Sequence, residues 1–114
     1  MDLNEAVLDH MTLHHAVTEY AKKPNGALKV EDLQAHDRCH LGRWLSTDGA
    51  AYRALAEHAS LEKEHAAFHK ASAETVRRAD AGTLDDDSLG EKGELKASFT
   101  RLCLAMTRFG FKIG

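Results

Sequence analysis

Apolar residues near the start of the chain recur every three to four positions, which is the spacing of one face of an α-helix. The pattern runs from residue 3 to residue 20, and Asp2 stands where the N-cap of such a helix belongs. His10 lies on the same stripe as Ala6 and Val17. The sequence therefore predicts a long first helix on which His10 faces inward.

The later segments also favour helices. Residues 30–46 combine short helical turns with Gly42, whereas residues 50–78 contain neither proline nor glycine and predict one or two helices. The acidic run Asp85–Asp87 indicates a helix start, with Ser88 or one of the aspartates as its cap. Near the C-terminus, steps of four and three residues separate the members of an apolar seam: Leu95, Phe99, Leu102, Met106, Phe109 and Ile113.

Alternating runs of β-branched residues and internal repeats are absent from the sequence. We therefore expect an all-α fold, an antiparallel four-helix bundle with an extra short helical segment that carries Cys39. The chain has 114 residues, of which 43% are hydrophobic and 29% are charged. This balance is typical of one soluble domain, which would span residues 1–114.

Charge and hydropathy exclude several classes of partner. The net charge is −3 and the basic residues are scattered, so neither nucleic acid nor an anionic membrane is an expected partner. The N-terminus lacks the regions of a signal peptide, no run of 18 apolar residues occurs, and a cytoplasmic protein is expected. There the two cysteines should stay reduced, with Cys103 packed beside the C-terminal seam.

Eight histidines are an unusual number for a chain of this length, so their positions call for a physical reason. His65 and His69 are four residues apart in a predicted helix, which places both imidazoles on one face within reach of one metal ion. That face is apolar, so both rings should point into the bundle, at the level of His10. Cys39 can supply a thiolate as the fourth ligand. The four residues form a candidate zinc site.

The spacing of the histidines does not by itself require a metal ion or fix every ligand. An inward-facing histidine can be hydrogen-bonded inside the core instead of binding a metal. His14 lies four residues after His10 and is the rival ligand. The remaining histidines are expected to face solvent or to lie in loops: His15, His36, His40 and His58.

Three motifs follow one another in the chain: Leu8-Asp9-His10, Cys39-His40-Leu41-Gly42-Arg43-Trp44-Leu45 and His65-Ala66-Ala67-Phe68-His69. In this order and spacing, the motifs resemble the chemoreceptor zinc-binding (CZB) domain family over residues 3 to about 80. The resemblance implies a helical bundle that holds one zinc ion through His10, Cys39, His65 and His69. One departure is Leu13, which stands where the family usually has a tryptophan.

The resemblance also implies a role in bacterial signalling. Domains of this family are attached to chemoreceptors or to diguanylate cyclases, and they control chemotaxis or cyclic-di-GMP synthesis. The chain contains neither a signalling hairpin nor a cyclase domain. We therefore expect a stand-alone regulator or an excised domain that acts on a signalling protein in cis or in trans, as a homodimer built through its helices.

The chemistry of a metal-bound thiolate suggests how such a domain would respond. Oxidants such as hypochlorous acid attack the thiolate, so segment 30–46 should dock when Cys39 binds the metal and be released when it does not. Zinc level and oxidant would then share one switch. The other motif residues are expected to pack around the site, while His40 and Arg43 point outward: Leu41, Gly42, Trp44 and Leu45.

An acid should accept a hydrogen bond from a ligand imidazole, because three neutral imidazoles and one thiolate leave a zinc centre with a net charge of about +1. Asp37 is the first choice, since its loop can fold toward a ligand, and Asp9, Glu62 and Glu64 are the others near the ligands.

Four protein ligands leave no open coordination position, so catalysis is not expected. The sequence also lacks the signatures of nucleophilic hydrolases and of phosphate-binding loops. Two other classes stay open. One is a hemerythrin-like di-iron bundle, which would need inward carboxylates and further histidines. The other is a helical interaction module without a metal, whose histidines are merely solvated.

Overall fold

The computed structural model describes residues 2–36, 39–90 and 93–113. Within these ranges no strand occurs and the helices pack together, which confirms the predicted all-α class. The α-helices and the 3-10 helices (η) follow one another as α1 (Leu3–Lys22), α2 (Val30–Gln34), α3 (His40–Ser46), η1 (Asp48–Tyr52), α4 (Ala56–Ala81), η2 (Asp86–Leu89) and α5 (Glu94–Ile113).

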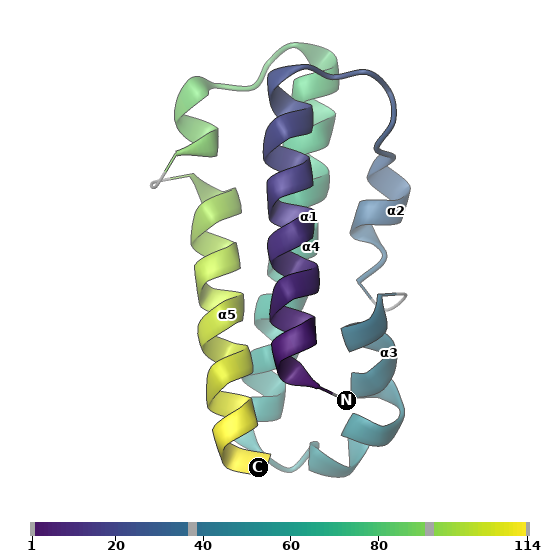
Figure 1. Ribbon diagram of the computed structural model, residues 1–114, viewed down its shortest axis with the longest axis vertical. Coiled ribbons are helices and arrows are strands. Elements are labelled where there is room, and N and C mark those ends of the chain that lie inside the picture. The colour runs from purple at the N-terminus through teal and green to yellow at the C-terminus, as the bar shows by residue number, and fades with distance from the viewer. Residues whose placement is uncertain (1, 37–38, 91–92, 114) are drawn as a thin grey trace.

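Helix α4 is the central element of the fold. It contacts α1, α2, α3 and α5, and its contact with α5 is the most extensive. In Figure 1 the chain rises through α1, returns along one side through α2 and α3, rises again through α4 and descends through α5. Both ends of the chain therefore lie at the same end of the molecule. One side of α4 contacts α1 and α2, and another side contacts α5.

Local sequence features set the ends of the long helices. The carboxylate of Asp2 accepts a hydrogen bond from the Asn4 N–H (2.9 Å), as expected for the N-cap of α1. Gly82 ends α4 in a left-handed conformation with φ of 73°, which residues with side chains rarely adopt. Residues 50–78, for which one or two helices were predicted, contribute the end of η1 and then a single long helix, α4.

The acidic run Asp85–Asp87 does begin a helix, but this helix is only the short η2. Asp85 occupies its N-cap position without a side-chain hydrogen bond to the helix.

The apolar seam predicted near the C-terminus lies on α5 and faces the core. Phe109 is fully buried, and its ring centre lies 5.9 Å from that of Trp44 and 5.8 Å from that of Tyr52. A Cβ atom on Gly49 would come within 2.7 Å of the Trp44 ring, so only glycine allows this close approach. Two further residues of the cysteine motif, Leu41 and Leu45, are buried in the same core.

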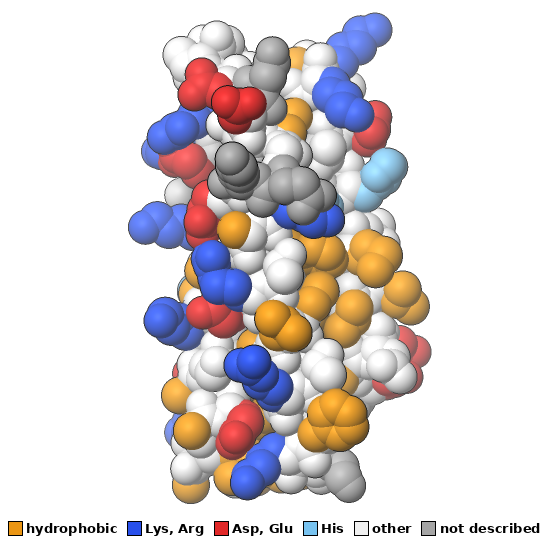
Figure 2. Space-filling model, turned by 90° about the vertical axis from the view of Figure 1, so that its left-hand side faces the viewer, with side chains coloured by type: hydrophobic (Ala, Val, Ile, Leu, Met, Phe, Trp, Pro, Cys, Tyr) orange, Lys and Arg blue, Asp and Glu red, His pale blue; other side chains and the backbone are white. Residues whose placement is uncertain are grey.

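Several large hydrophobic side chains remain at the surface. Phe111 is 84% exposed, and Leu8, Met11 and Leu104 are about half exposed. Figure 2 shows hydrophobic side chains gathering on the right-hand half of one face of the molecule. A groove of about 280 Å³ between the start of α1 and the end of α5 is lined mainly by Leu3, Val7, Met106, Gly110 and Phe111.

His58 is buried, which corrects the prediction that it faces solvent. Its exposed fraction is 2%, its Nδ1 lies 3.7 Å from a carboxylate oxygen of Glu62, and its ring centre lies 5.9 Å from that of Phe109. His58 stands three residues before Leu61, which is itself fully buried. The helical register of α4 therefore turns His58 inward.

Candidate metal centre

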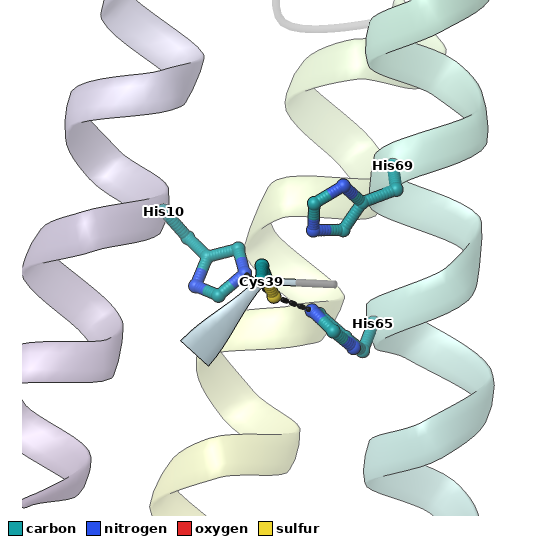
Figure 3. A group of neighbouring side chains, drawn as sticks. All are labelled: His10, Cys39, His65 and His69. Atoms are coloured by element: carbon teal, nitrogen blue, oxygen red, sulfur yellow. Dashed lines mark hydrogen bonds between the residues drawn. The ribbon is translucent and has the colours of Figure 1, made fainter. Parts of the chain in front are cut away.

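The four residues predicted to bind a metal come from three separate elements and meet in the interior. Figure 3 shows His10 projecting from α1 toward His65 and His69 on successive turns of α4, with Cys39 between them. Cys39 directly precedes α3 and is its N-cap residue. The four potential ligand atoms all lie within 4.8 Å of one another. Residues far apart in the sequence thus form one compact group.

Burial keeps the three imidazoles of this group uncharged. His65 is 1% exposed, and His10 and His69 are each 4% exposed. Burial is the main reason that the pKa of His65 falls to about 2 and that of His69 to about 4. The pKa of His10 is also lowered, chiefly by burial. Near neutral pH, each ring therefore offers an unprotonated nitrogen, which is the form that binds a metal ion.

Backbone carbonyl groups orient two of the rings. His10 Nδ1–H donates to the carbonyl oxygen of Ala6 (2.7 Å), and His69 Nδ1–H donates to that of Leu33 in α2 (2.9 Å). A carbonyl oxygen only accepts, so Nδ1 carries the proton and Nε2 carries the free lone pair in both rings. His69 Nε2 is buried and has no hydrogen-bond partner among the described residues. A metal ion would satisfy this atom.

Cys39 brings the one sulfur atom of the group. Its Sγ lies 3.0 Å from His65 Nε2 and 4.0 Å from His10 Nε2, and the Gly42 N–H donates to it at 3.5 Å. Burial raises the pKa of the Cys39 thiol, and the hydrogen bond from Gly42 opposes this effect. Without a metal the thiol is therefore protonated near neutral pH, and metal binding must release this proton.

The geometry fits the size of a tetrahedral metal ion. With Zn–N about 2.0 Å and Zn–S about 2.3 Å, neighbouring donor atoms in a zinc site are about 3.3–3.6 Å apart. The two sulfur–nitrogen distances of 3.0 and 4.0 Å bracket this range. A movement of about 1 Å at the most distant pair would complete the coordination sphere.

Backbone carbonyl groups accept the Nδ1–H hydrogen bonds that are described for the ligand imidazoles. Asp37, the first choice, lies outside the described residues, and two carbonyl groups take the role of hydrogen-bond acceptor. Burial is the largest cause of the pKa shifts of His10 and Cys39. The negative charge of the exposed Asp9 raises the pKa of both groups. Asp9 therefore contributes electrostatically to the site without a hydrogen bond to a ligand among those described.

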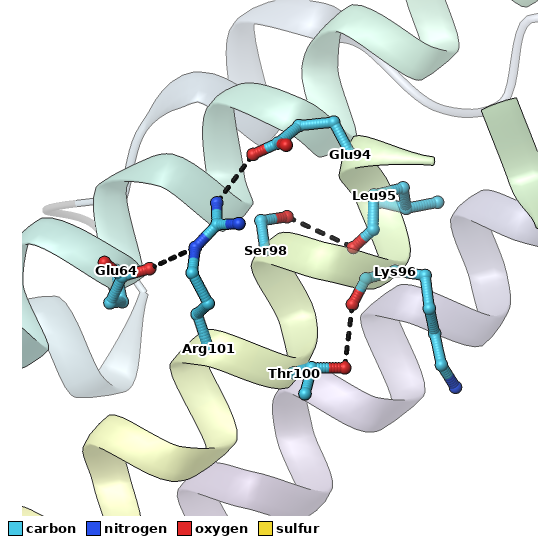
Figure 4. A network of polar contacts seen from close by, with 7 residues as sticks. All are labelled: Glu64, Glu94, Leu95, Lys96, Ser98, Thr100 and Arg101. Carbon is cyan, nitrogen blue, oxygen red and sulfur yellow. Dashed lines mark hydrogen bonds and ion pairs between the residues drawn. The ribbon is translucent and has the colours of Figure 1, made fainter. Parts of the chain in front are cut away.

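The two glutamates near the ligands lie on different sides of α4. Glu62 shares a small surface cavity with His65. Glu64 instead accepts a hydrogen bond from Arg101 Nε (2.7 Å), while Arg101 Nη2 donates to Glu94 (2.6 Å), as Figure 4 shows. Glu64 thus links α4 to α5 and does not face the histidines.

His14, the rival ligand, is not a member of the group of four. Its ring stacks on Phe99 with a centroid distance of 4.8 Å and an interplanar angle of 19°. Burial lowers its pKa. Cys103 is half-buried and packs against the hydrophobic core, as predicted.

One residue near the site was not among the predicted site residues. His36 was expected to face solvent or to lie in a loop. It is exposed, and its ring centre is 5.8 Å from that of His65 and 6.4 Å from that of His69. Its position three residues before Cys39 could have indicated this, because the chain that places Cys39 at the site must also run close to the site at residue 36.

Comparisons with protein families, with curated proteins and with solved structures give no match to this chain. The structure contains no helix, within the described ranges, that is both long and apolar enough to cross a membrane.

Proposed function

We propose that this chain is a zinc-binding regulatory domain whose ion is held by His10, Cys39, His65 and His69. The observation that carries the proposal is the convergence of three neutral imidazoles and one thiol within 4.8 Å, with His69 Nε2 buried and unpaired among the described residues. The resemblance of the three motifs to the CZB family supports the same four ligands. An antiparallel four-helix bundle, with α2 and α3 together in the second position, is the corresponding fold.

Zinc is the metal that this donor set favours. Imidazole and thiolate ligands in a tetrahedral arrangement are typical of zinc, whereas di-iron centres in helical bundles use several carboxylates. The group of four contains no carboxylate. An interaction module without a metal would leave the buried His69 Nε2 without a partner, so it accounts for the site less well.

A regulatory role, rather than catalysis, follows from the closed ligand set. Four protein ligands leave no coordination position for water or substrate, and the three histidines of the group are at most 4% exposed. In this proposal the protein responds to zinc availability or to oxidation of the bound thiolate, for example by hypochlorous acid.

The segment that would transmit the response is formed by α2 and α3. It contributes two contacts to the site, the Cys39 thiolate and the Leu33 carbonyl group that holds His69 Nδ1–H at 2.9 Å. Loss of the ion or oxidation of Cys39 would weaken this attachment at both points. The segment would then separate from α4 and change the surface presented to a signalling partner.

We further propose that the chain forms a homodimer and regulates a chemoreceptor or a diguanylate cyclase from the cytoplasm, and so chemotaxis or cyclic-di-GMP synthesis. The groove between the start of α1 and the end of α5 supports the dimer, because Phe111 is 84% exposed beside it. The expected mass in sedimentation at tens of micromolar is that of a dimer, and a monomer under these conditions would contradict this part of the proposal.

The zinc content of the purified protein tests the proposed function. We expect about one zinc ion per chain by elemental mass spectrometry, and a Cys39→Ala variant should lose most of it on dialysis against a chelator. Cys103→Ala is the matched control, because Cys103 is half-buried away from the group of four. No zinc in the wild-type protein, or equal retention by both variants, would refute the proposed site.

A further inference from the structure

The four-ligand group is buried on every side except one. Its three histidines are at most 4% exposed, whereas Cys39 is only half-buried. Cys39 is therefore the most accessible of the four ligands.

A small cavity opens beside the group, and His65 is the member of the group that lines it. It has a volume of about 190 Å³ and reaches from the protein surface to His65. We call it the access pocket, and its lining residues are His36, Gly42, Leu45, Ser46, Glu62 and His65. The pocket is large enough for a hydrated ion, since a water molecule occupies about 30 Å³ in the liquid.

Besides His65, two of the residues that line the access pocket have side chains that bind metal ions. Glu62 is 54% exposed and offers a carboxylate, and the exposed His36 offers an imidazole. Because the ring of His36 faces those of His65 and His69, the imidazole lies between solvent and the buried group.

The ring of His36 lies farther from the rings of His65 and His69 than the ligand rings lie from one another. Ring centres within the group are 4.7–5.5 Å apart, whereas His36 lies 5.8 Å from His65 and 6.4 Å from His69. The carbonyl oxygen of His36 lies 3.4 Å from Cys39 Sγ and accepts its S–H. His36 is therefore hydrogen-bonded to Cys39, the most exposed of the four ligands.

From this geometry we infer that His36 is an auxiliary ligand, which receives a divalent metal ion in the access pocket and passes it to the four buried ligands. The inference rests on the proposed zinc site and deepens it. In the transfer an imidazole nitrogen of His36 and the carboxylate of Glu62 replace water molecules on the incoming ion. His10, His65 and His69 would then bind, and the Cys39 thiol would lose its proton to water and bind as the thiolate, so that both His36 and Glu62 would be displaced from the ion.

An auxiliary ligand of this kind changes rates and leaves the equilibrium unchanged. It lowers the barrier between the free and the bound ion, so it accelerates uptake and release by the same factor. A resident ligand would instead change the affinity and the coordination geometry.

The test compares His36→Gln with His40→Gln, in which another exposed histidine of the same region is replaced. Stopped-flow measurements follow zinc chloride uptake by metal-free protein and zinc removal by excess chromogenic chelator. We expect both rates to fall several-fold in His36→Gln and to be unchanged in His40→Gln. Zinc content and the visible spectrum of the cobalt-substituted protein should equal those of the wild type in both variants.

Two results would overturn the inference while the zinc site itself stands. Unchanged rates in His36→Gln would show that the ion does not use this residue. A lower zinc content or an altered cobalt spectrum in His36→Gln would make His36 a resident ligand. If the wild-type protein binds no zinc, the proposed function fails, and this inference fails with it.

Discussion

The two sides of α4 are stabilised by different interactions. Toward α5, Phe68 packs against Phe99 with ring centres 5.5 Å apart, and the fully buried Phe109 and Leu102 extend the apolar contact. Toward α1 and α2, the same helix presents His65 and His69, whose buried polar atoms need partners. In the proposed function, the α4–α5 contact is stable without an ion, whereas a bound ion strengthens the attachment of α2 and α3, which also bury Leu33, Leu41 and Leu45 in the core.

The largest effect is expected from a change on the apolar side. Leu102→Ala removes a side chain that is 0% exposed, so the free energy of unfolding should fall by about 2–5 kcal/mol. Urea unfolding should give the same loss with and without zinc. Leu104→Ala is the control, because its side chain is 50% exposed and should contribute less than about 1 kcal/mol. A loss that vanishes in the metal-free protein would mean that the two sides are not independent.

Zinc removal should affect the histidine side. At a free zinc concentration of about 100 times the dissociation constant, the bound ion stabilises the fold by about 2.7 kcal/mol, which chelation removes. Hydrogen exchange should then accelerate in α2 and α3 and stay slow in the middle of α5. Equal acceleration in both regions, or none in α2 and α3, would contradict the proposed switch.

The metal-free protein should lose stability in acid because of its buried histidines. An unfolded histidine titrates near pH 6.5, whereas the pKa values of folded His65 and His69 are about 2 and about 4. Below about pH 6.5 the unfolded chain therefore binds more protons, so this stability is fully present above that pH and declines as the pH falls toward the folded values. The slope should not exceed about 1.4 kcal/mol per pH unit for each histidine. Urea midpoints that stay constant from about pH 7 to about pH 5 would argue against neutral buried rings.

The smallest effect is expected from the ion pairs that join α4 and α5 at the surface. Arg101→Ala removes the contacts with Glu64 and Glu94, which are solvent-exposed pairs worth less than about 1 kcal/mol. Zinc content should be unchanged, because Glu64 does not face the site. A large loss of zinc would show that this network positions α4 for metal binding.

Helical periodicity is the reason that much of the fold could be predicted from the sequence. The spacing of Leu95, Phe99 and Leu102 gives the buried face of α5, and the same rule turns His65 and His69 to one side of α4. Helical periodicity does not predict the position of Cys39. Its place beside the histidines followed from zinc chemistry and from the family motif.

Other features could not be predicted because they depend on tertiary contacts. The carbonyl groups of Ala6 and Leu33 hold two ligand rings, and a backbone acceptor has no signature in the sequence. His36 approaches His65 only because of the path of its loop. His58 was expected to face solvent or to lie in a loop, although the register of α4 from Leu61 onward would have placed it inward.

X-ray absorption at the zinc edge tests the central claim most directly, because it reports the atoms bound to the ion in the loaded protein. We expect three nitrogen neighbours at about 2.0–2.1 Å and one sulfur neighbour at about 2.3 Å, with the sulfur lost in Cys39→Ala. A first shell without sulfur in the wild-type protein, or one that keeps its sulfur in the variant, would contradict a site formed by His10, Cys39, His65 and His69.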